Sequence, residues 1–248
     1  MNNQAFQKLS PNHPLTNEQN SLINRIIKFA AAHLQNKNIP AVFTIYGDAG
    51  TGKSVILSSL FDRIQKLSRN NTAPFSGTQN YFLVNHPELL KVYKQIAGPL
   101  QELYKKDYMR PTSFINQLDK KQKTADIVVI DEAHLLLSQP DHYNNFYHNN
   151  QLEEIIKLAK VVVLVFDEYQ VLRMKSFWTK ERLEQITHRY AHEEYVLHHQ
   201  FRMTAPDNLI NWFDAFTQGT LRPLDKTMWQ NYDFPYFYRC RKNAPGNH

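Results

Sequence analysis

Short apolar runs recur along the first 200 residues, and most of them show no regular alternation with polar positions. They lie at residues 42–46, 81–84, 127–130 and 161–166, with a weaker one at 195–197. Runs of this kind are typical of strands that are buried on both faces. The segments between them place apolar residues three or four positions apart, as amphipathic helices do. Strands that alternate with helices predict an α/β fold, a mostly parallel sheet with helices on both faces.

Two of the helical segments carry further signals. Residues 16–19, Thr-Asn-Glu-Gln, match a capping box, in which Thr16 bonds the amide three residues on and Gln19 reaches back. Residues 87–122 are expected to be mostly helical, with a break at Arg110-Pro111, because proline ends or interrupts a helix.

A glycine-rich turn joins the first strand to the helix after it. The chain has seven glycines in 248 residues, and three of them fall in the stretch GDAGTGKS. This stretch fits the phosphate-binding pattern G-x-x-x-x-G-K-[ST] at every position, between a strand and a helix. Backbone amides and the positive end of the helix dipole would face the phosphates, where larger side chains would obstruct them. The alternative is a turn that is rich in glycine by chance. The residues predicted to bind nucleotide are Gly47, Asp48, Ala49, Gly50, Thr51, Gly52, Lys53 and Ser54.

Reactive groups are expected in this loop and after the strand at 127–130. Lys53 would reach the β- and γ-phosphates, and the Ser54 hydroxyl would coordinate Mg²⁺. In IVVIDEAH, Asp131 and Glu132 follow a buried strand, at the edge of an open parallel sheet where ligands bind. We expect Asp131 to hold the Mg²⁺ shell through water, and Glu132 to orient the attacking water. The alternative is a strand that ends in a solvated acidic turn.

The stretch VVVLVFDEYQ repeats this arrangement at residues 161–170. Gln170 is placed to sense the γ-phosphate or the attacking water. Asp167 and Glu168 are interpreted as structural residues, and a plain surface turn is a competing interpretation.

Five stretches resemble, in their order, the first RecA-like domain of superfamily-one helicases. They are LTNEQ, GDAGTGKS, IVVIDEAH, VFDEYQ and LHHQFRM. The chain looks most similar to the Schlafen group-3-like DNA/RNA helicase domain family, and the resemblance covers roughly residues 13–235. It implies a RecA-like P-loop NTPase fold and an ATP-dependent helicase-like activity on DNA or RNA.

The resemblance also implies three site residues. Gln19 would read the adenine edge, although its capping role is an alternative. Gln170 would link the nucleotide state to the nucleic-acid groove. Arg202 would approach the γ-phosphate, where a guanidinium matches phosphate geometry, or would be a surface arginine before a helix. The third motif usually carries glycine-aspartate before its glutamine, whereas here Tyr169 precedes Gln170, which weakens that assignment.

Composition and charge narrow the class of protein. The single cysteine suits a reducing compartment, and the polar N-terminus lacks the apolar core of a signal peptide. These features favour a cytoplasmic protein. The net charge of +6 permits a nucleic-acid partner. Residues 91–123 hold eight lysines or arginines with Tyr93, Tyr104 and Tyr108 among them, which suits single strands. A solvated helix face with the tyrosines turned into the core is the favoured interpretation.

We expect an N-terminal extension at residues 1–14, one P-loop domain at 15–235 and an irregular tail at 236–248. The tail lacks apolar periodicity, which raises the hypothesis of a frameshifted truncation that removes the second motor lobe and leaves the ATPase weak. A naturally short protein is the alternative. ATP and Mg²⁺ are the expected cofactors. A non-motor P-loop ATPase, acting as a nucleotide-dependent switch for a protein partner, is the competing function, and an inert fragment is a third.

Overall fold

The computed structural model describes residues 9–35, 39–48, 50–170 and 178–197, together with residues 215, 220 and 223. The chain divides into two compact units, Met1–Gln200 and Phe201–His248. Almost all described residues belong to the first unit. Among the described residues, none of the helices combines the length and the apolar character that crossing a membrane would require.

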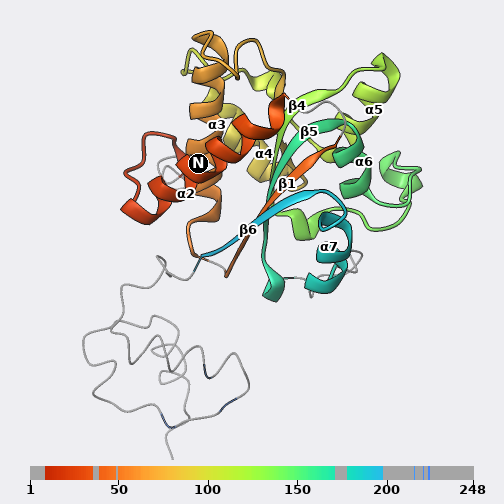
Figure 1. Ribbon diagram of the computed structural model, residues 1–248. Coiled ribbons are helices and arrows are strands. Elements are labelled where there is room, and N and C mark those ends of the chain that lie inside the picture. Colours follow the sequence, from red (N-terminus) through yellow and green to blue (C-terminus); the bar gives the residue numbers. More distant parts are fainter. Residues whose placement is uncertain are drawn as a thin grey trace, which may run out of the picture. The chain divides into compact units, whose positions relative to one another are not determined.

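Six parallel strands form one sheet in the first unit, in the order β3-β2-β4-β5-β1-β6 (Figure 1). The strands are β1 (Ala41–Gly47), β2 (Asn80–Val84), β3 (Tyr108–Met109), β4 (Ala125–Asp131), β5 (Ala159–Phe166) and β6 (Ala191–Leu197). Every residue of β1 from Ala41 to Tyr46 is buried. The four unbroken apolar runs are therefore strands, as predicted.

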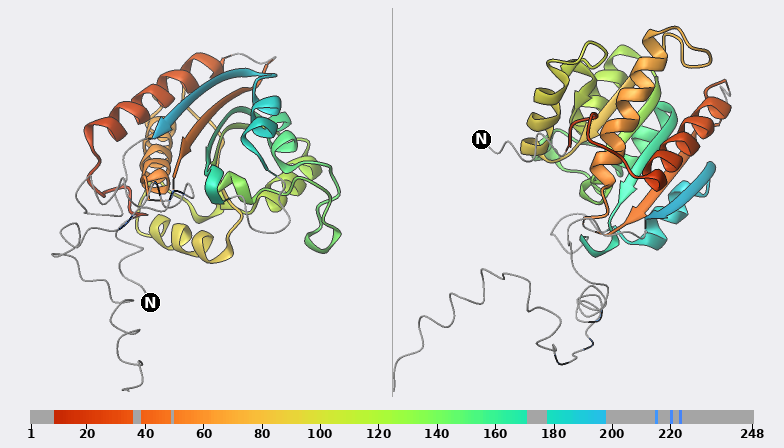
Figure 2. Two further views of the ribbon diagram at one scale, coloured as in Figure 1. Left: turned by 90° about the horizontal axis from the view of Figure 1, so that it is seen from below. Right: turned by 90° about the vertical axis from the view of Figure 1, so that its left-hand side faces the viewer.

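Helices cover both faces of this sheet, as the three views show (Figures 1 and 2). One face carries α2 (Asn17–Leu34), α3 (Lys53–Arg69) and α4 (Pro87–Ala97), and the other carries α5 (Pro111–Lys121), α6 (Gln151–Lys157) and α7 (Lys180–Thr187). Each set encloses its own apolar cluster against the sheet. Short 3₁₀ helices lie at Lys105–Asp107, Ala133–Leu135, His142–Asn144 and Glu168–Gln170.

The segment at 87–122 is mostly helical, as predicted, because α4 and α5 are 11 residues long each. Between the two helices the chain forms a 3₁₀ turn and then the two-residue strand β3, which was not predicted. Buried Tyr108 packs against Phe61 and Phe82, and these tertiary contacts hold the segment extended. A strand of two residues is too short to show the alternation of polar and apolar positions that would predict it from the sequence. The predicted break is confirmed, because α5 begins at Pro111.

Strand β6 is longer than its apolar run at 195–197 because it lies at the edge of the sheet, where the polar residues His192, Glu193 and Glu194 stay partly or fully exposed. The capping box is also confirmed. The Gln19 amide donates to the Thr16 hydroxyl at 3.2 Å, and the Gln19 side-chain oxygen accepts from the Thr16 amide at 3.0 Å.

Candidate nucleotide site

Close backbone approach explains the glycines between β1 and α3. A Cβ at Gly47 would lie 2.8 Å from Thr51 Oγ1 and 3.1 Å from the Leu197 Cβ, so a side chain there would force its neighbours apart. Gly50 and Gly52 have φ angles of 95° and 81°, in the left-handed region that favours glycine. Gly52 is also the N-cap of α3, where it directs the chain into the helix. The loop therefore turns tightly and ends at the positive end of the α3 dipole.

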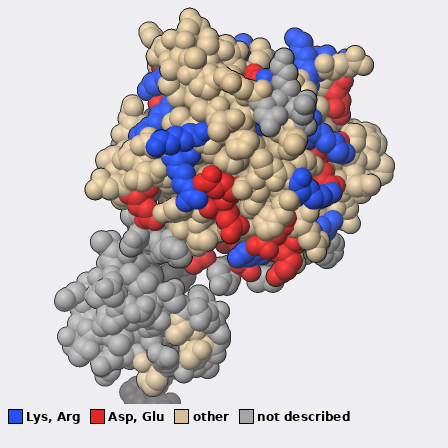
Figure 3. All heavy atoms as spheres, in the orientation of Figure 1, with Lys and Arg blue, Asp and Glu red and all other residues tan. Residues whose placement is uncertain are grey.

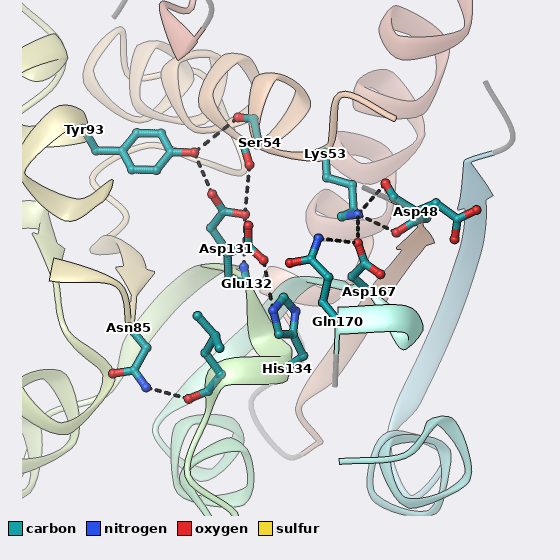
Figure 4. A network of polar contacts seen from close by, with 12 residues as sticks. Asp48, Lys53, Ser54, Asn85, Tyr93, Asp131, Glu132, His134, Asp167 and Gln170 are labelled. Atoms are coloured by element: carbon teal, nitrogen blue, oxygen red, sulfur yellow. Dashed lines mark hydrogen bonds and ion pairs between the residues drawn. The ribbon is translucent and has the colours of Figure 1, made fainter. Parts of the chain in front are cut away.

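Lys53 is the first residue of α3, and its side chain folds back over the loop (Figure 4). Its ammonium donates to the carbonyl of Gly47, to that of Asp48 at 2.8 Å and to Asp167 Oδ2 at 2.9 Å. The side chain of Lys53 is 8% exposed and that of Asp167 is 0% exposed. Asp167, directly after β5, thus forms a buried ion pair that holds the Lys53 ammonium at the loop.

Ser54 and Asp131 meet at the carboxyl edge of the sheet. The Ser54 hydroxyl donates to Asp131 Oδ1 at 3.3 Å, and the Glu132 amide donates to the same oxygen at 3.0 Å. The Tyr93 hydroxyl donates to Asp131 Oδ2 at 2.7 Å and lies 3.4 Å from the Ser54 carbonyl (Figure 4). Oxygens from α3 and β4 therefore converge at one point, directly beside the glycine loop.

Burial is the main cause of the pKa shifts of Asp131 and Tyr93. It raises the pKa of Asp131 above its usual value, and hydrogen bonds from Tyr93, Ser54 and the Glu132 amide, together with the Lys53 charge, oppose this shift. Burial, followed by the nearby Asp131 charge, raises the pKa of Tyr93 well above its ordinary value. Tyr93 is accordingly protonated and acts as a donor to the carboxylate.

Glu132 and His134 form a second contact just beyond β4. Glu132 has a φ of 55°, a left-handed conformation that is uncommon for a residue with a side chain. Its Oε2 lies 3.3 Å from His134 Nε2, and the Glu132 side chain is 25% exposed. Burial lowers the pKa of His134, which favours the neutral ring, and this ring lies beside the Glu132 carboxylate. The carboxylate at position 132 thus contacts a buried histidine and still reaches solvent.

Gln170 lies in the 3₁₀ turn after β5, and its side-chain amide donates to Asp167 Oδ2 at 2.8 Å. Asp167 therefore connects Gln170 to Lys53 (Figure 4). The adjacent Glu168 is exposed. Asp167, interpreted from the sequence as a structural residue, contacts the loop lysine itself.

The remaining predicted residues fall into two groups. Gln19 is 5% exposed, and its side-chain oxygen takes part in the capping box, the alternative weighed above. Ala49 and Arg202 lie outside the described residues, as does the segment 236–248.

The tyrosines of the basic segment have different environments. Tyr93 and Tyr108 are 1% and 2% exposed, as the favoured interpretation predicts. Tyr104 is 47% exposed, and the Arg69 guanidinium lies 3.6 Å above its ring.

Three residues that contact the predicted site residues were not placed in the site from the sequence: Tyr93, His134 and Asp167. Asp167 and His134 follow apolar strands, so their position at the sheet edge was a usable signal. Tyr93 lies in the middle of a helix, and the sequence contains no signal that its hydroxyl reaches Asp131.

The fold class follows from three features: a parallel sheet, a glycine loop after β1, and an acidic strand end beside that loop. This domain has the RecA-like P-loop NTPase fold. The chain belongs to the family described as Schlafen group 3, DNA/RNA helicase domain, which matches residues 40–243. The predicted fold class and the resemblance to this family are both confirmed.

Among curated proteins, the uncharacterized protein YPL245W of Saccharomyces cerevisiae is 42% identical over 241 residues. The match covers 91% of this chain and 53% of the yeast protein, so the chain spans about half the length of that curated relative.

Solved structures that match this chain include the Pif1 helicase from Candida albicans, with 15% identity and a TM-score of 0.44 over 95% of this chain and 49% of that one. A DNA replication initiation factor has 15% identity and a TM-score of 0.42, over 95% of this chain and 63% of that one. AMPPCP-bound DnaA from Aquifex aeolicus has 16% identity and a TM-score of 0.40, over 89% of this chain and 58% of that one.

Proposed function

We propose that this domain binds ATP with Mg²⁺ and hydrolyses the bond between its β- and γ-phosphates, as the NTPase part of a helicase-like protein. One observation carries the proposal: the Ser54 hydroxyl lies 3.3 Å from Asp131 Oδ1, at the end of the glycine loop. The loop and the acidic strand end are 77 positions apart in the sequence, and the fold brings them together.

The donor set fits Mg²⁺, which prefers oxygen ligands in proteins. Ser54 supplies a hydroxyl and Asp131 a carboxylate, and both would hold the ion directly or through water. Burial disfavours the ionised form of Asp131, and a cation at this point would favour it. The bound Mg²⁺ supplies charge neutralisation for the phosphate oxygens.

Residues of the chain itself would perform the other tasks. The backbone amides of residues 47–54 and the start of α3 would bind the phosphates. Lys53, which now donates to loop carbonyls, would exchange them for β- and γ-phosphate oxygens. Glu132, oriented by His134, would position the attacking water.

The residues implied by family resemblance complete the proposal. Gln19 would contact the adenine edge, Gln170 would report the γ-phosphate state through Asp167, and Arg202 would stabilise charge in the transition state. The contact between Gln170 and Asp167 supports the second of these roles, because Asp167 also pairs with Lys53. The proposed domain takes in residues 15–235.

Membership of a DNA/RNA helicase family supports single-stranded DNA or RNA as the partner. Two observations favour the competing function, a nucleotide-dependent switch that acts on a protein partner. On the face seen in Figure 3, lysines and arginines are interspersed with aspartates and glutamates. Tyr93 and Tyr108 are buried and cannot stack on bases.

Nucleotide binding is tested with Lys53→Ala, titrated with a fluorescent ATP analogue in the presence of Mg²⁺. We expect binding to be lost or severely weakened. Since this change leaves Asp167 buried without its ammonium partner, thermal melting must first show that the variant is folded. Lys53→Arg keeps the charge but not the compact ammonium, so it should also bind poorly.

A matched control and a second assay complete the test. Lys91→Ala alters an exposed lysine that pairs with Glu88, and it should bind nucleotide normally. Unchanged affinity in folded Lys53→Ala would refute the loop assignment. In an ATPase assay, stimulation by single-stranded DNA or RNA supports the helicase-like function, and indifference supports the switch.

A further inference from the structure

A cluster of metal-binding side chains lies away from the nucleotide site, where α7 turns into the edge strand β6. His188 caps the carboxyl end of α7, and His192 and Glu194 follow on β6. Each offers one ligand atom, and these atoms all lie within 4.8 Å of one another. The described part of the chain contains this one group of three or more such residues.

Strand geometry brings the three side chains to the same side of the sheet. Residues 192 and 194 are two apart, so their side chains point to one face of β6. On the other face, Glu193 pairs with Arg25 and the Tyr195 hydroxyl donates to Glu18, both on α2. The rings of His188 and His192 have centroids 4.7 Å apart.

The environment of His192 suits a neutral, oriented metal ligand. Its Nε2 lies 3.2 Å from the hydroxyl of Thr44, a fully buried residue of the neighbouring strand β1. A hydrogen bond from Nε2–H to Thr44 leaves the Nδ1 lone pair for a cation, and metal-binding histidines usually have such an oxygen partner.

We propose that His188, His192 and Glu194 bind a divalent cation of the zinc class and thereby tie the end of α7 to the edge strand β6. Two imidazoles and a carboxylate are a ligand set that Zn²⁺ takes, with water in the fourth position. Ligands of a tetrahedral zinc ion lie about 3.4 Å apart. His188 and Glu194 are exposed, so rotation of their side chains can close the remaining gap.

The site is separate from the proposed nucleotide site. His192 and Glu194 are in register with Val42 and Thr44, in the first half of β1, whereas the glycine loop follows the other end of that strand. The ligand atoms of the proposed metal site are nitrogen and oxygen, whereas Ser54 and Asp131 offer oxygen alone. The two sites can therefore be tested independently.

The test uses the full chain, stripped of metal with a chelator and titrated with Co²⁺ alone. We expect the visible absorption of four-coordinate cobalt, abolished by Zn²⁺ as it displaces the probe. In His188→Ala/His192→Ala and in Glu194→Gln, Co²⁺ affinity should fall at least about 100-fold, since the changes remove ligands. His13→Ala, which alters an exposed histidine outside the cluster, should match the original chain.

Thermal melting supplies an independent measurement. Zn²⁺ at about one hundred times its Kd should raise the Tm of the original chain by about 5 °C or more. The double variant should melt cooperatively and show no such shift. Equal Co²⁺ affinity and an equal shift in the original chain and the folded double variant would overturn the proposal, and so would an original chain that shows neither.

Discussion

Strands β4 and β5 are both buried apolar runs followed by Asp-Glu, and yet their carboxylates meet different partners. Asp131, the last residue of β4, accepts hydrogen bonds from Ser54 and Tyr93. Asp167 after β5 forms an ion pair with Lys53 and accepts from Gln170. One local pattern thus produces an oxygen cluster at the first strand and an ammonium-carboxylate pair at the second.

The order of strands in the sheet causes this difference. Strand β5 lies directly beside β1, so Asp167 reaches the first residue of α3, where Lys53 folds back over the loop. Strand β4 is one place further out, and Asp131 meets Ser54, the next residue of α3, and Tyr93 of α4. The helices above each strand end decide which donors the carboxylate finds.

The second carboxylates differ as well. Glu132 adopts a left-handed conformation and contacts His134, with 25% of its side chain exposed. Glu168 lies in a 3₁₀ turn and is exposed. Among the described residues, a side-chain contact is recorded for Glu132, at His134, and this contact favours Glu132 for the water-positioning role that we propose.

The largest effect is expected on turnover, when Glu132→Gln is compared with Glu168→Gln. Glu132→Gln keeps the size of the side chain and its acceptor for His134 but loses the charge that polarises water. Turnover should fall about 10²–10⁴-fold, with nucleotide affinity retained. Glu168→Gln is the matched control, and steady-state ATPase assays should find it unchanged. Equal losses in both variants would contradict the distinction, as would a joint loss of binding and turnover in Glu132→Gln.

Removal of one partner from the buried pair should give the largest loss of stability. Asp167→Ala leaves the Lys53 ammonium buried without its carboxylate, which costs about 3–5 kcal/mol of unfolding free energy. Lys53→Ala/Asp167→Ala should lose less than the sum of the two single variants, because neither charge remains. Urea denaturation monitored by circular dichroism measures all three. Strict additivity would show that the two charges do not interact.

Loss of one hydroxyl from the oxygen cluster should have a smaller effect. Tyr93→Phe removes the donor to Asp131 Oδ2 and preserves the packing of the ring. We expect a loss of about 1.5–3 kcal/mol in unfolding free energy, the range for hydrogen bonds to charged groups. Tyr104→Phe alters an exposed tyrosine and should change stability by less than about 0.5 kcal/mol. Similar losses for both tyrosines would argue against the hydrogen bond to Asp131.

The smallest effect on stability is expected at Gln170. Gln170→Ala removes a partly exposed hydrogen bond to Asp167, worth about 0.5–1.5 kcal/mol. If Gln170 reports the nucleotide state, this variant should reduce nucleic-acid-stimulated ATP turnover more than basal turnover. The same assay with Glu168→Gln serves as the comparison. Equal reduction of the two rates would assign Gln170 a local structural role.

Local patterns determined much of this protein. The stretch GDAGTGKS predicts its own conformation, since the φ angles at Gly50 and Gly52 and the close approach at Gly47 all favour glycine. Apolar runs without alternation predicted the buried parallel strands, because such strands exclude polar residues from both faces. The capping box between Thr16 and Gln19 was equally local, as its contacts span three residues.

Contacts between distant segments were decided only by the tertiary structure. Tyr93 and Asp131 are 38 positions apart, and Lys53 and Asp167 are 114 apart. No periodicity along the chain encodes which side chains meet across that distance. Residues 108 and 109 form a strand because Tyr108 is buried against Phe61 and Phe82. Local sequence shaped the loop and the strands, whereas the order of strands in the sheet chose the partner of each carboxylate, because hydrogen bonds and ion pairs depend on separation in space.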